Sequence, residues 1–547
     1  MLRPFRGVRF AVDDPGAVTS PPYDLISDDD VQSLLDSHPN NVVRLILPRP
    51  PARPAQRYGA ARDALRTWLA DGVLIRDDHP ALYVYEQQAP GILQRGLIGD
   101  VGLAAPEQRI ILPHENVMPG PVADRLALMS TTQANLEPIL LLYNGNDPAT
   151  HQDTKDTPTA GYRGSGTSGS AASQGRASRL VDEVATTRPP LVTAETSDGV
   201  RHSLWAITDQ AEIDAVNADL RQRQALIADG HHRYATYREL QRLDHTRRPS
   251  TTPTTQPTAD APTAVTAQPA ADAPPAATTL TPTDAPPPAT AQPAADAPTS
   301  PTAPTAPDAP PPAATPTSTD APSPATAPTG TADRQGPATN TPTYSSVASP
   351  TDAASGEPTG PWDFGLALLV DSDTYPPDLK AIHRVIPALP LEEAAARAKG
   401  AWRVQDFADL PSGLAALQEA HEPAFLLAGE GGGHLLTDPD PVQLARAMPD
   451  DRSARWNALN TSVLTEFVLP KVWGMRDDEV DVRIVHHDAQ AAADLATSCG
   501  GTAVILNALA VDDVLAVAAE GERVPRKSTS FGPKPRTGLV LRTLDTS

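Results

Sequence analysis

Residues 225–234 read Ala-Leu-Ile-Ala-Asp-Gly-His-His-Arg-Tyr, and this stretch carries most of the information about the fold. A short apolar run at 226–228 is interrupted by Asp229 and Gly230, and apolar residues then recur at helical spacing from Arg233 onward. The pattern predicts a strand that turns through a glycine into a helix. Because the first turn of a helix has free backbone N–H groups and the positive end of the dipole, this junction suits an anion.

Three basic side chains stand where the predicted helix begins: His231, His232 and Arg233. They concentrate hydrogen-bond donors and positive charge where a phosphate or carboxylate group would lie. The alternative is a plain turn whose histidines cap the helix and pack against the core. The apolar run, the Asp-Gly pair and the basic helix start together favour an anion site.

Amino-acid composition separates one long proline-rich segment from the rest of this chain of 547 residues. The segment from Pro249 to Pro361 holds 28 of the 61 prolines, a single aromatic residue and an Asp-Ala-Pro motif that recurs every 12 residues. Such a segment buries too little apolar surface to offset chain entropy, which predicts a disordered spacer. The expected parts are an N-terminal α+β part at 1–146, a Gly/Ser-rich surface loop at 147–178, the Asp-Gly-His-His-Arg region at 179–248, the spacer at 249–361 and a C-terminal α+β part at 362–547.

Helices and strands are expected on both sides of the spacer. Ser27 precedes three aspartates and an apolar face, which predicts a capped amphipathic helix over 28–35. Apolar runs that predict strands lie at 82–85, 97–101, 139–143, 204–207 and 366–370. The pattern indicates a mixed α+β fold in two lobes, interrupted by the spacer.

Charge and cysteine content exclude several classes of protein. A net charge of −23 argues against binding nucleic acid, whose phosphates attract basic surfaces. Cys499 is the only cysteine, which excludes disulfide frameworks and Cys-based zinc sites. No apolar stretch reaches the roughly 18 residues that span a bilayer, and the first residues lack the apolar centre of a signal peptide. We expect a cytoplasmic protein that binds a small molecule or a nucleotide.

Two loops carry candidate binding groups, since loops are where rigid scaffolds present chemistry. Tyr23 and Asp24 follow two prolines and are candidate substrate contacts, although a plain turn before a helix would look the same. His114 is a further substrate-contact candidate. Its neighbour Glu115 is a candidate general base or metal ligand, and Arg125 a candidate clamp for phosphate or carboxylate. A salt-bridged loop is the alternative.

A third motif lies near the C-terminus. Lys527 is followed by Ser528 and Thr529, and Lys534 comes shortly after. Two ammonium groups and two hydroxyls suit a chain of phosphates, whereas an exposed basic tail is the alternative. The sequence has no Walker motif, no kinase glycine loop with its partner motifs and no Gly-x-Ser-x-Gly.

In order along the chain, these motifs resemble those of a bacterial and archaeal family, the domain of unknown function 1015. The matching pieces are Pro4-Phe5-Arg6-Gly7, Pro21-Pro22-Tyr23-Asp24, residues 40–45, His114-Glu115, Gly120-Pro121 with 124–126, residues 229–234, His383-Arg384, residues 527–529, Pro533-Lys534 and Gly538-Leu539. Val117 stands where the family usually has threonine, which puts a phosphate-binding hydroxyl at that position in doubt.

The segment at 229–233 is similar to the Gly-His-x-Arg-type helix start of the ParB/sulfiredoxin-like superfamily. That group includes nucleotide-hydrolysing partition proteins, sulfiredoxins and archaeal free-serine kinases. The resemblance implies that Gly230 and the three basic residues after it hold nucleotide phosphates. It also implies that Asp229 or Glu115 is the base or the carboxylate facing Mg²⁺, with His232 as a further catalytic candidate.

Three functional hypotheses follow. The leading one is a phosphotransferase that acts on a small hydroxyl substrate such as free serine, with ATP or ADP as donor and Mg²⁺, because this chemistry needs mainly cations, N–H groups, a metal and a base. The second is a nucleotide-binding regulatory protein without metabolite turnover. The third is a metal-dependent hydrolase using His114, Glu115, His231 and His232, whose spacing fits no recognised zinc motif. Each requires the distant motifs to converge.

Overall fold

The computed structural model describes residues 2–49, 56–145, 174–247, 360–477 and 481–544. The predicted spacer at 249–361 and the predicted loop at 147–178 lie almost entirely outside these residues. The end of the loop prediction needs a correction, because helix α6 (Arg176–Thr187) begins inside it. The Ala177 backbone N–H in the first turn of α6 donates to Asp219 Oδ2 (2.8 Å), which anchors this helix start.

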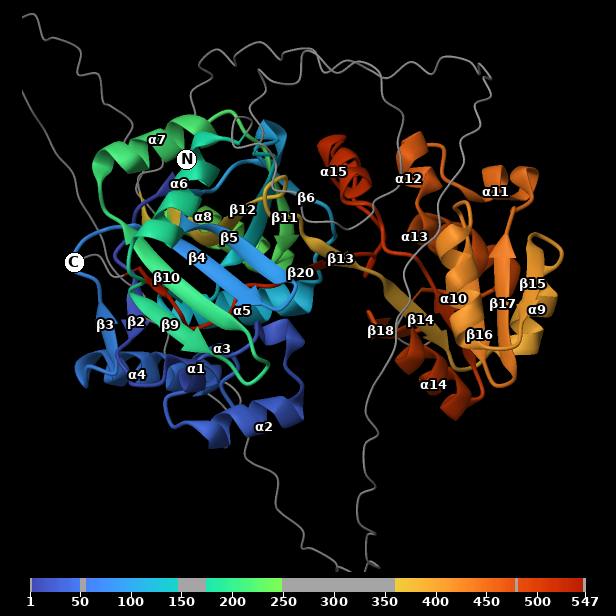
Figure 1. Cartoon of the computed structure of the whole chain (residues 1–547), viewed down its shortest axis with the longest axis horizontal. Coiled ribbons are helices and arrows are strands. Elements are labelled where there is room, and N and C mark those ends of the chain that lie inside the picture. Colours follow the sequence, from blue (N-terminus) through green and yellow to red (C-terminus); the bar gives the residue numbers. More distant parts are fainter. Residues whose placement is uncertain (1, 50–55, 146–173, 248–359, 478–480, 545–547) are drawn as a thin grey trace, which may run out of the picture. The chain divides into compact units, whose positions relative to one another are not determined.

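The larger sheet has nine strands in the order β6-β11-β8-β12-β5-β4-β10-β9, with β1 beside β5 (Figure 1). Its strands are β1 (Leu2–Arg3), β4 (Leu82–Ala89), β5 (Ile92–Gly102), β6 (Ile111–Pro113), β8 (Ile139–Tyr143), β9 (Val192–Glu195), β10 (Arg201–Ile207), β11 (Ala225–Asp229) and β12 (Phe364–Asp371). Every residue of β8, β11 and β12 is buried. Strands buried on both faces read as continuous apolar runs, which is why these three stood out in the sequence.

Helices and the C-terminal segment cover the two faces of this sheet. On one face α6, α7 (Gln210–Leu220) and α8 (His231–Arg247) bury apolar side chains in one cluster. On the other face α15 (Val511–Ala519) buries apolar side chains in a second cluster, which Phe531, further along the C-terminal segment, also joins. The Val524 N–H donates to the His114 carbonyl oxygen (2.8 Å). The C-terminal segment therefore runs directly beside the loop that follows β6.

A smaller cluster near the N-terminus carries the predicted capped helix. The Ser27 hydroxyl accepts from the Asp30 N–H, and the Asp30 carboxylate accepts from the Ser27 N–H, which forms a capping box. The elements around it are β2 (Val8–Phe10), α1 (Pro15–Val18), the 3₁₀ turn η1 (Tyr23–Leu25), α2 (Asp28–Ser37), α3 (Val43–Ile46), α4 (Arg57–Ala70), β3 (Leu74–Arg76), α5 (Pro119–Thr132), β7 (Ala134–Asn135) and β21 (Arg542–Thr543), while the 3₁₀ turn η3 (Pro106–Gln108) connects β5 to β6.

A second sheet of six strands follows, in the order β15-β17-β16-β19-β14-β18 (Figure 1, gold to red). Apolar residues are buried on both of its faces. The remaining elements are η5 (Pro361–Asp363), β13 (Asp378–Lys380), β14 (Ile382–Ile386), α9 (Leu391–Ala398), β15 (Arg403–Phe407), α10 (Leu410–Glu419), β16 (Phe425–Gly429), β17 (Gly432–Thr437), α11 (Pro441–Ala447), α12 (Ala454–Ala458), α13 (Asn460–Val463), the π-helix η6 (Leu464–Trp473), β18 (Arg483–His486), α14 (Ala489–Cys499), β19 (Thr502–Ile505) and β20 (Ser530–Gly532).

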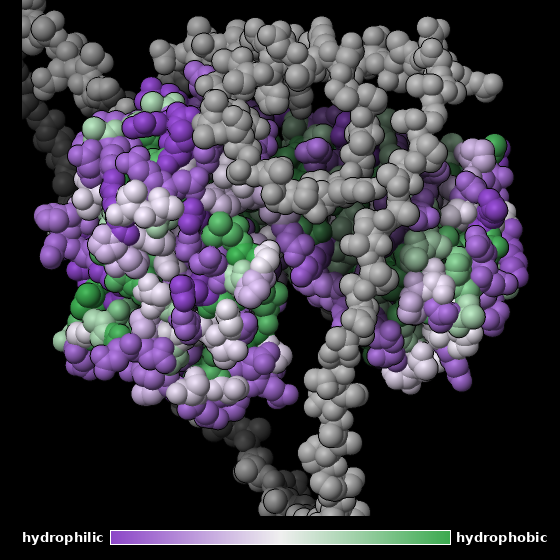
Figure 2. Space-filling model, viewed as in Figure 1, coloured by the Kyte–Doolittle hydropathy of each residue, from purple (hydrophilic) through white to green (hydrophobic). Residues whose placement is uncertain are grey.

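The predicted mixed α+β class is confirmed by these two sheets and their helices. Figure 2 shows hydrophilic residues over much of the face in view, with hydrophobic residues in smaller patches. Across the described parts of the chain, no helix has the length and apolar character needed to cross a bilayer.

Candidate functional site

The strand–glycine–helix junction predicted at 225–234 is present. Strand β11 ends at Asp229, and α8 begins at His231, two residues before the predicted start. Between them Gly230 has a φ of +90°, a conformation that L side chains rarely adopt. A Cβ added to Gly230 would lie 2.8 Å from Ile139 Cγ2, so both backbone conformation and space require glycine here.

The motifs from the two ends of the chain meet at this junction through Lys534. Its Nζ lies 2.6 Å from Asp24 Oδ2 and 2.7 Å from Asp229 Oδ1. Burial alone would lower the pKa of Lys534, but the two carboxylates outweigh it and raise this pKa. Burial would likewise raise the pKa of Asp24, yet Lys534 and Arg233 lower it overall. Lys534 and Asp24 therefore both stay ionised.

Arg233 is directed into the protein, with only 1% of its surface exposed. Its Nη2 donates to Asp229 Oδ2 (2.5 Å) and its Nη1 to the Pro138 carbonyl oxygen (2.6 Å). The pKa of Arg233 is raised, because Asp229 and other nearby acidic groups outweigh the effect of burial. In this arrangement the guanidinium holds the end of β11, and its two terminal nitrogens are already engaged.

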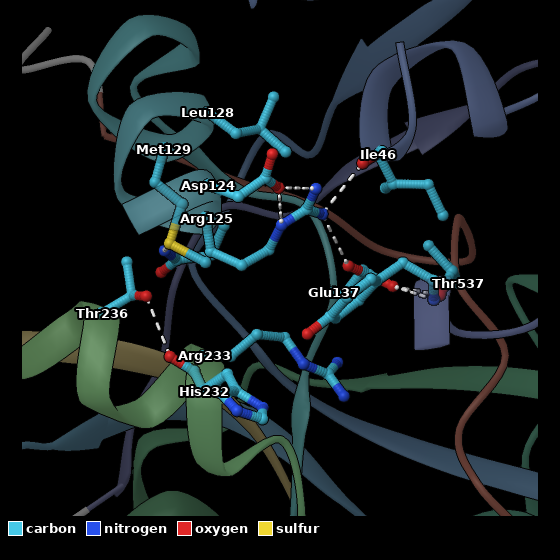
Figure 3. Close-up of polar contacts among 12 residues, drawn as sticks. Ile46, Asp124, Arg125, Leu128, Met129, Glu137, His232, Arg233, Thr236 and Thr537 are labelled. Atoms are coloured by element: carbon cyan, nitrogen blue, oxygen red, sulfur yellow. Dashed lines mark hydrogen bonds and ion pairs between the residues drawn. The ribbon is translucent and has the colours of Figure 1, made fainter. Parts of the chain in front are cut away.

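Arg125 forms a second buried cation close by. It pairs with Asp124, its Nη1 donates to the Ile46 carbonyl oxygen (2.8 Å), and its Cζ lies 4.4 Å from the ring centre of Tyr23. Figure 3 shows the side chains of Arg125 and Arg233 extending from α5 and α8 toward Glu137. Burial raises the pKa of Tyr23 to about 12, so its hydroxyl stays protonated.

Glu137 is a site residue that sequence reasoning missed. Its carboxylate is 4% exposed and accepts hydrogen bonds from the Tyr23 N–H (3.0 Å) and the Thr537 hydroxyl (3.3 Å). These bonds fasten the Tyr23 turn and the C-terminal segment to the start of β8. An isolated Glu-Pro pair before an apolar run gave no signal, since both of these hydrogen-bond partners are more than 100 residues away in sequence.

His114, Glu115 and Thr529 form a hydrogen-bonded group. His114 Nε2 lies 2.8 Å from the Thr529 hydroxyl oxygen, and that hydroxyl lies 3.1 Å from Glu115 Oε1. Burial lowers the pKa of His114 to about 3, which keeps its imidazole neutral. Burial also raises the pKa of Glu115, although Thr529 and Lys527 counteract it. A carboxylate with a raised pKa next to a hydroxyl is suited to general base work.

The two histidines of the junction have different surroundings. His231 is buried, its ring lies edge-on to His114 with 4.5 Å between centroids, and its Nε2 accepts from the His114 N–H (3.3 Å). His232 is partly exposed, and its Nε2 accepts from the Met118 N–H (3.1 Å). Burial lowers the pKa of both imidazoles. His231 packs inside, while His232 is the histidine that faces the site.

Lys527 makes no ion pair with any residue of the described ranges, unlike Arg125, Arg233 and Lys534. Its charge nevertheless affects the pKa of Glu115 and that of His232, so the ammonium lies within electrostatic range of both. Lys527 has a φ of +55°, an uncommon backbone conformation for a residue with a side chain.

Two hydrogen bonds hold the turn that contains Lys527. The Ser528 hydroxyl donates to the Pro525 carbonyl oxygen (2.6 Å), and Arg384 Nη2 donates to the Arg526 carbonyl oxygen (2.9 Å). Arg384 lies on β14 and is 1% exposed. Arg384, from the His383-Arg384 motif of the sequence, thus supports the turn that contains Lys527.

His486, at the end of β18, is a second site residue that sequence reasoning missed. Burial and the positive charge of Lys527 lower the pKa of its imidazole to about 4, and Lys534 and Asp24 also act on it. The neighbouring His487 contacts Ser530 (Nε2 to Oγ, 2.5 Å). A His-His pair occurs at 486–487 as at 231–232, each at the end of an apolar run, and this repetition was the signal available in the sequence.

The structure therefore brings together the predicted residues of all four segments, 23–24, 114–125, 229–233 and 527–534. Within the ranges that the structure describes, no three His, Cys, Asp or Glu side chains form a group that could hold a metal ion. The assembled groups are a free ammonium, a histidine at a helix start, and carboxylates held by cations. This arrangement suits an anionic ligand beside a carboxylate base.

Fold and site define a mixed α+β protein whose N-terminal and C-terminal motifs meet at the start of one helix. Residues 2–163 and 167–266 match the model of the family described as Protein of unknown function (DUF1015). The resemblance inferred from the motifs is confirmed over these residues. The C-terminal motifs at 383–384 and 527–539 lie outside the match, and the ParB/sulfiredoxin-like resemblance stays a prediction.

Comparison with solved structures gave distant similarities. A free serine kinase in complex with AMP is 10% identical with a TM-score of 0.29, over 81% of this chain and 92% of that one. A mutant free serine kinase in complex with ADP is 9% identical with a TM-score of 0.30, over 81% and 92%. A conserved hypothetical protein from Pyrococcus furiosus is 10% identical with a TM-score of 0.29, over 81% and 93%. No curated protein matches this chain.

Proposed function

We propose that this protein is a phosphotransferase that transfers a phosphoryl group from a nucleotide to a small hydroxyl substrate such as free serine. The observation that carries the proposal is Lys527, which makes no ion pair in the described ranges, stands in a turn held by two hydrogen bonds and influences the pKa of Glu115 and that of His232. Phosphoryl transfer depends mainly on positioning and on cations around the transferring group. A cation, a helix start and a carboxylate base in one place meet these needs.

The phosphates would bind between Lys527 and the start of α8. The first-turn N–H groups of a helix have no intrahelical acceptor and carry the positive end of the dipole. His232 would add a hydrogen bond from its partly exposed ring. Arg233 and Arg125 would add positive charge without bonding to the phosphates directly, because their terminal nitrogens already bond to Asp229, Pro138, Asp124 and Ile46.

Glu115 is the better candidate for the general base. Its pKa is raised by burial, and it shares the Thr529 hydroxyl with His114. A base is most effective when its pKa approaches the working pH. Asp229 is less suited to this role, because its carboxylate bonds to both Arg233 and Lys534.

Mg²⁺ fits this donor set as a partner of the nucleotide. Mg²⁺ is usually bound by one or two carboxylates together with substrate phosphates. Asp24, whose side chain is 37% exposed, is the carboxylate that would hold it, and Glu115 stays available as the base. The ion would neutralise charge on the phosphates, while the protein groups bind, orient and accept the hydroxyl proton.

The test is phosphoryl transfer from labelled ATP and ADP to a panel of small hydroxyl compounds that includes free serine. We expect the Lys527→Met variant to lose about a hundredfold or more of the transfer rate, because it removes a cation that acts on the developing charge. Lys399→Met is the matched control, since Lys399 is exposed at the end of α9, and it should retain the full rate.

Two other outcomes are informative. Transfer that is equal in the wild type and Lys527→Met would contradict the proposed site. Nucleotide binding that is lost in Lys527→Met, without transfer to any acceptor in the wild type, would replace the proposal with a nucleotide-binding regulatory protein.

A further inference from the structure

We propose that the chain has a second anion-binding site, built around Arg3 and Arg6. A cavity of about 220 Å³ lies between the first residues of the chain and β21. Its charged lining consists of four arginines, Arg3, Arg6, Arg76 and Arg542, and one aspartate, Asp100. An excess of guanidinium groups is unusual in a chain with a net charge of −23, and it marks this cavity as a place for negative charge.

The floor of the cavity is a buried ion pair. Arg542 is 3% exposed and Asp100 is 1% exposed, and Arg542 Nε lies 2.6 Å from Asp100 Oδ1. The other nitrogens of Arg542 donate to Asn135 Oδ1 (2.8 Å) and to the Pro361 carbonyl oxygen (2.7 Å). Every nitrogen of this guanidinium is engaged, so the floor is rigid and its single carboxylate is neutralised.

Arg3 and Arg6, at the rim of the cavity, have N–H donors without an acceptor in the described ranges. Arg3 Nη2 donates to Asp100 Oδ2 (2.8 Å), and its Cζ lies 3.6 Å from the centre of the Phe364 ring, which fixes the guanidinium plane. Arg6 uses only Nε, which donates to the Asp77 carbonyl oxygen (2.8 Å). Nε and Nη1 of Arg3 and both Nη atoms of Arg6 bond to no residue of the described ranges. The Pro4-Phe5-Arg6 motif of the sequence therefore lines a cavity with open donors.

The size and chemistry of the cavity indicate its ligand. Guanidinium groups present paired N–H donors that match the oxygens of phosphate or carboxylate. The volume lies below the roughly 300 Å³ at which pockets for drug-sized molecules begin, so the ligand is a small oxyanion of the size of inorganic phosphate. Asp545 follows Leu544 of the cavity lining in the sequence, and its carboxylate has the same chemistry.

The experiment is isothermal titration of inorganic phosphate into the full chain carrying Lys527→Met, which removes the main free cation of the α8 site. We expect one bound phosphate, and we expect Arg6→Gln to weaken it about tenfold or more, the usual worth of a hydrogen bond to a charged group. Arg201→Gln is the control, because Arg201 is an exposed arginine on β10, and it should leave the affinity unchanged.

Equal affinity in the Arg6→Gln variant, or no phosphate bound at all, overturns the proposal. A third variant, Asp545→Asn, distinguishes a free phosphate from a carboxylate of the chain itself as the bound anion. If phosphate binds only when Asp545 is replaced, the carboxylate of the chain itself occupies the cavity, and the proposal of a free anion fails. The result is independent of phosphoryl transfer, because none of these measurements uses a nucleotide or an acceptor.

Discussion

At the scale of single residues, the site consists of several cations paired with carboxylates and of one cation, Lys527, without such a partner in the described ranges. Arg125, Arg233 and Lys534 each hold a carboxylate, whereas Lys527 holds none in the described ranges. Buried ion pairs of this kind position loops more than they stabilise a fold, because desolvation offsets most of the attraction. They leave a single ammonium available to a ligand.

The buried neutral histidines give a prediction about pH. The pKa of His114 is lowered to about 3, whereas that of an unfolded histidine is about 6.5. Between these values the unfolded chain binds more protons, so this contribution to stability is complete above pH about 6.5 and is lost as the pH falls toward the folded pKa. Each pH unit in this window costs about 1.4 kcal/mol per such histidine.

We therefore expect the midpoint of thermal unfolding to fall steadily between pH 6.5 and 4, and to fall less steeply in a His114→Gln variant. Glutamine keeps a polar atom near the Thr529 hydroxyl, which His114 Nε2 contacts. The variant His79→Gln replaces an exposed histidine and serves as the control. Parallel curves for wild type and His114→Gln would contradict the assignment of a buried neutral imidazole.

At the scale of elements, the junction between β11 and α8 decides where the site forms. The β11 strand is buried on both faces, and its last residue, Asp229, is bonded to Arg233 in the first turn of α8. The strand therefore fixes the position of the helix start, and the loop after β6 is fixed in turn by hydrogen bonds to His231 and His232. Rigid elements thus hold loop residues in place.

Gly230 gives the prediction at this scale. Gly230→Ala forces a Cβ into a positive φ and to 2.8 Å from Ile139 Cγ2, so we expect a loss of about 1–2 kcal/mol or more in unfolding free energy. Gly59→Ala is the control: Gly59 lies inside α4 with no atom within 4 Å of the added Cβ, and alanine there should add about 0.5–1 kcal/mol. Denaturant unfolding measures both. A tolerated alanine at 230 would mean that the junction is not held as described.

At the scale of the whole molecule, the last turns of α8 meet the turn η5, which directly precedes β12. Asp363 Oδ1 lies 3.0 Å from Gln241 Nε2 and 2.5 Å from His245 Nε2. The two described ends that flank residues 248–359 are thus joined by direct hydrogen bonds. A short linker is enough to connect them.

We expect a chain in which residues 249–359 are replaced by a short Gly/Ser linker to fold cooperatively and to retain phosphoryl transfer. The sequence interpretation of this segment as a spacer predicts the result, and the bonds of Asp363 make the connection feasible. Calorimetry and the transfer assay check it. A broad, non-cooperative unfolding transition in the shortened chain would show that the segment contributes to the core.

The sequence by itself determined the local elements and their class. Continuous apolar runs gave β8, β11 and β12, and the Ser27 cap gave α2, because burial on both faces and capping leave local patterns. It also identified the motif segments that meet at the start of α8. These segments could be recognised in the sequence because each has polar residues next to a predicted strand or turn.

Only the tertiary structure decided which of these residues face the site. Arg233 and His231 are buried, whereas His232 and Lys527 are partly exposed, and no local sequence pattern separates these cases. Glu137 and His486 entered the site without a sequence signal specific to it, because their partners come from segments far away along the chain. Charge compensation depends on distances in space, and spacing along the chain does not encode those distances.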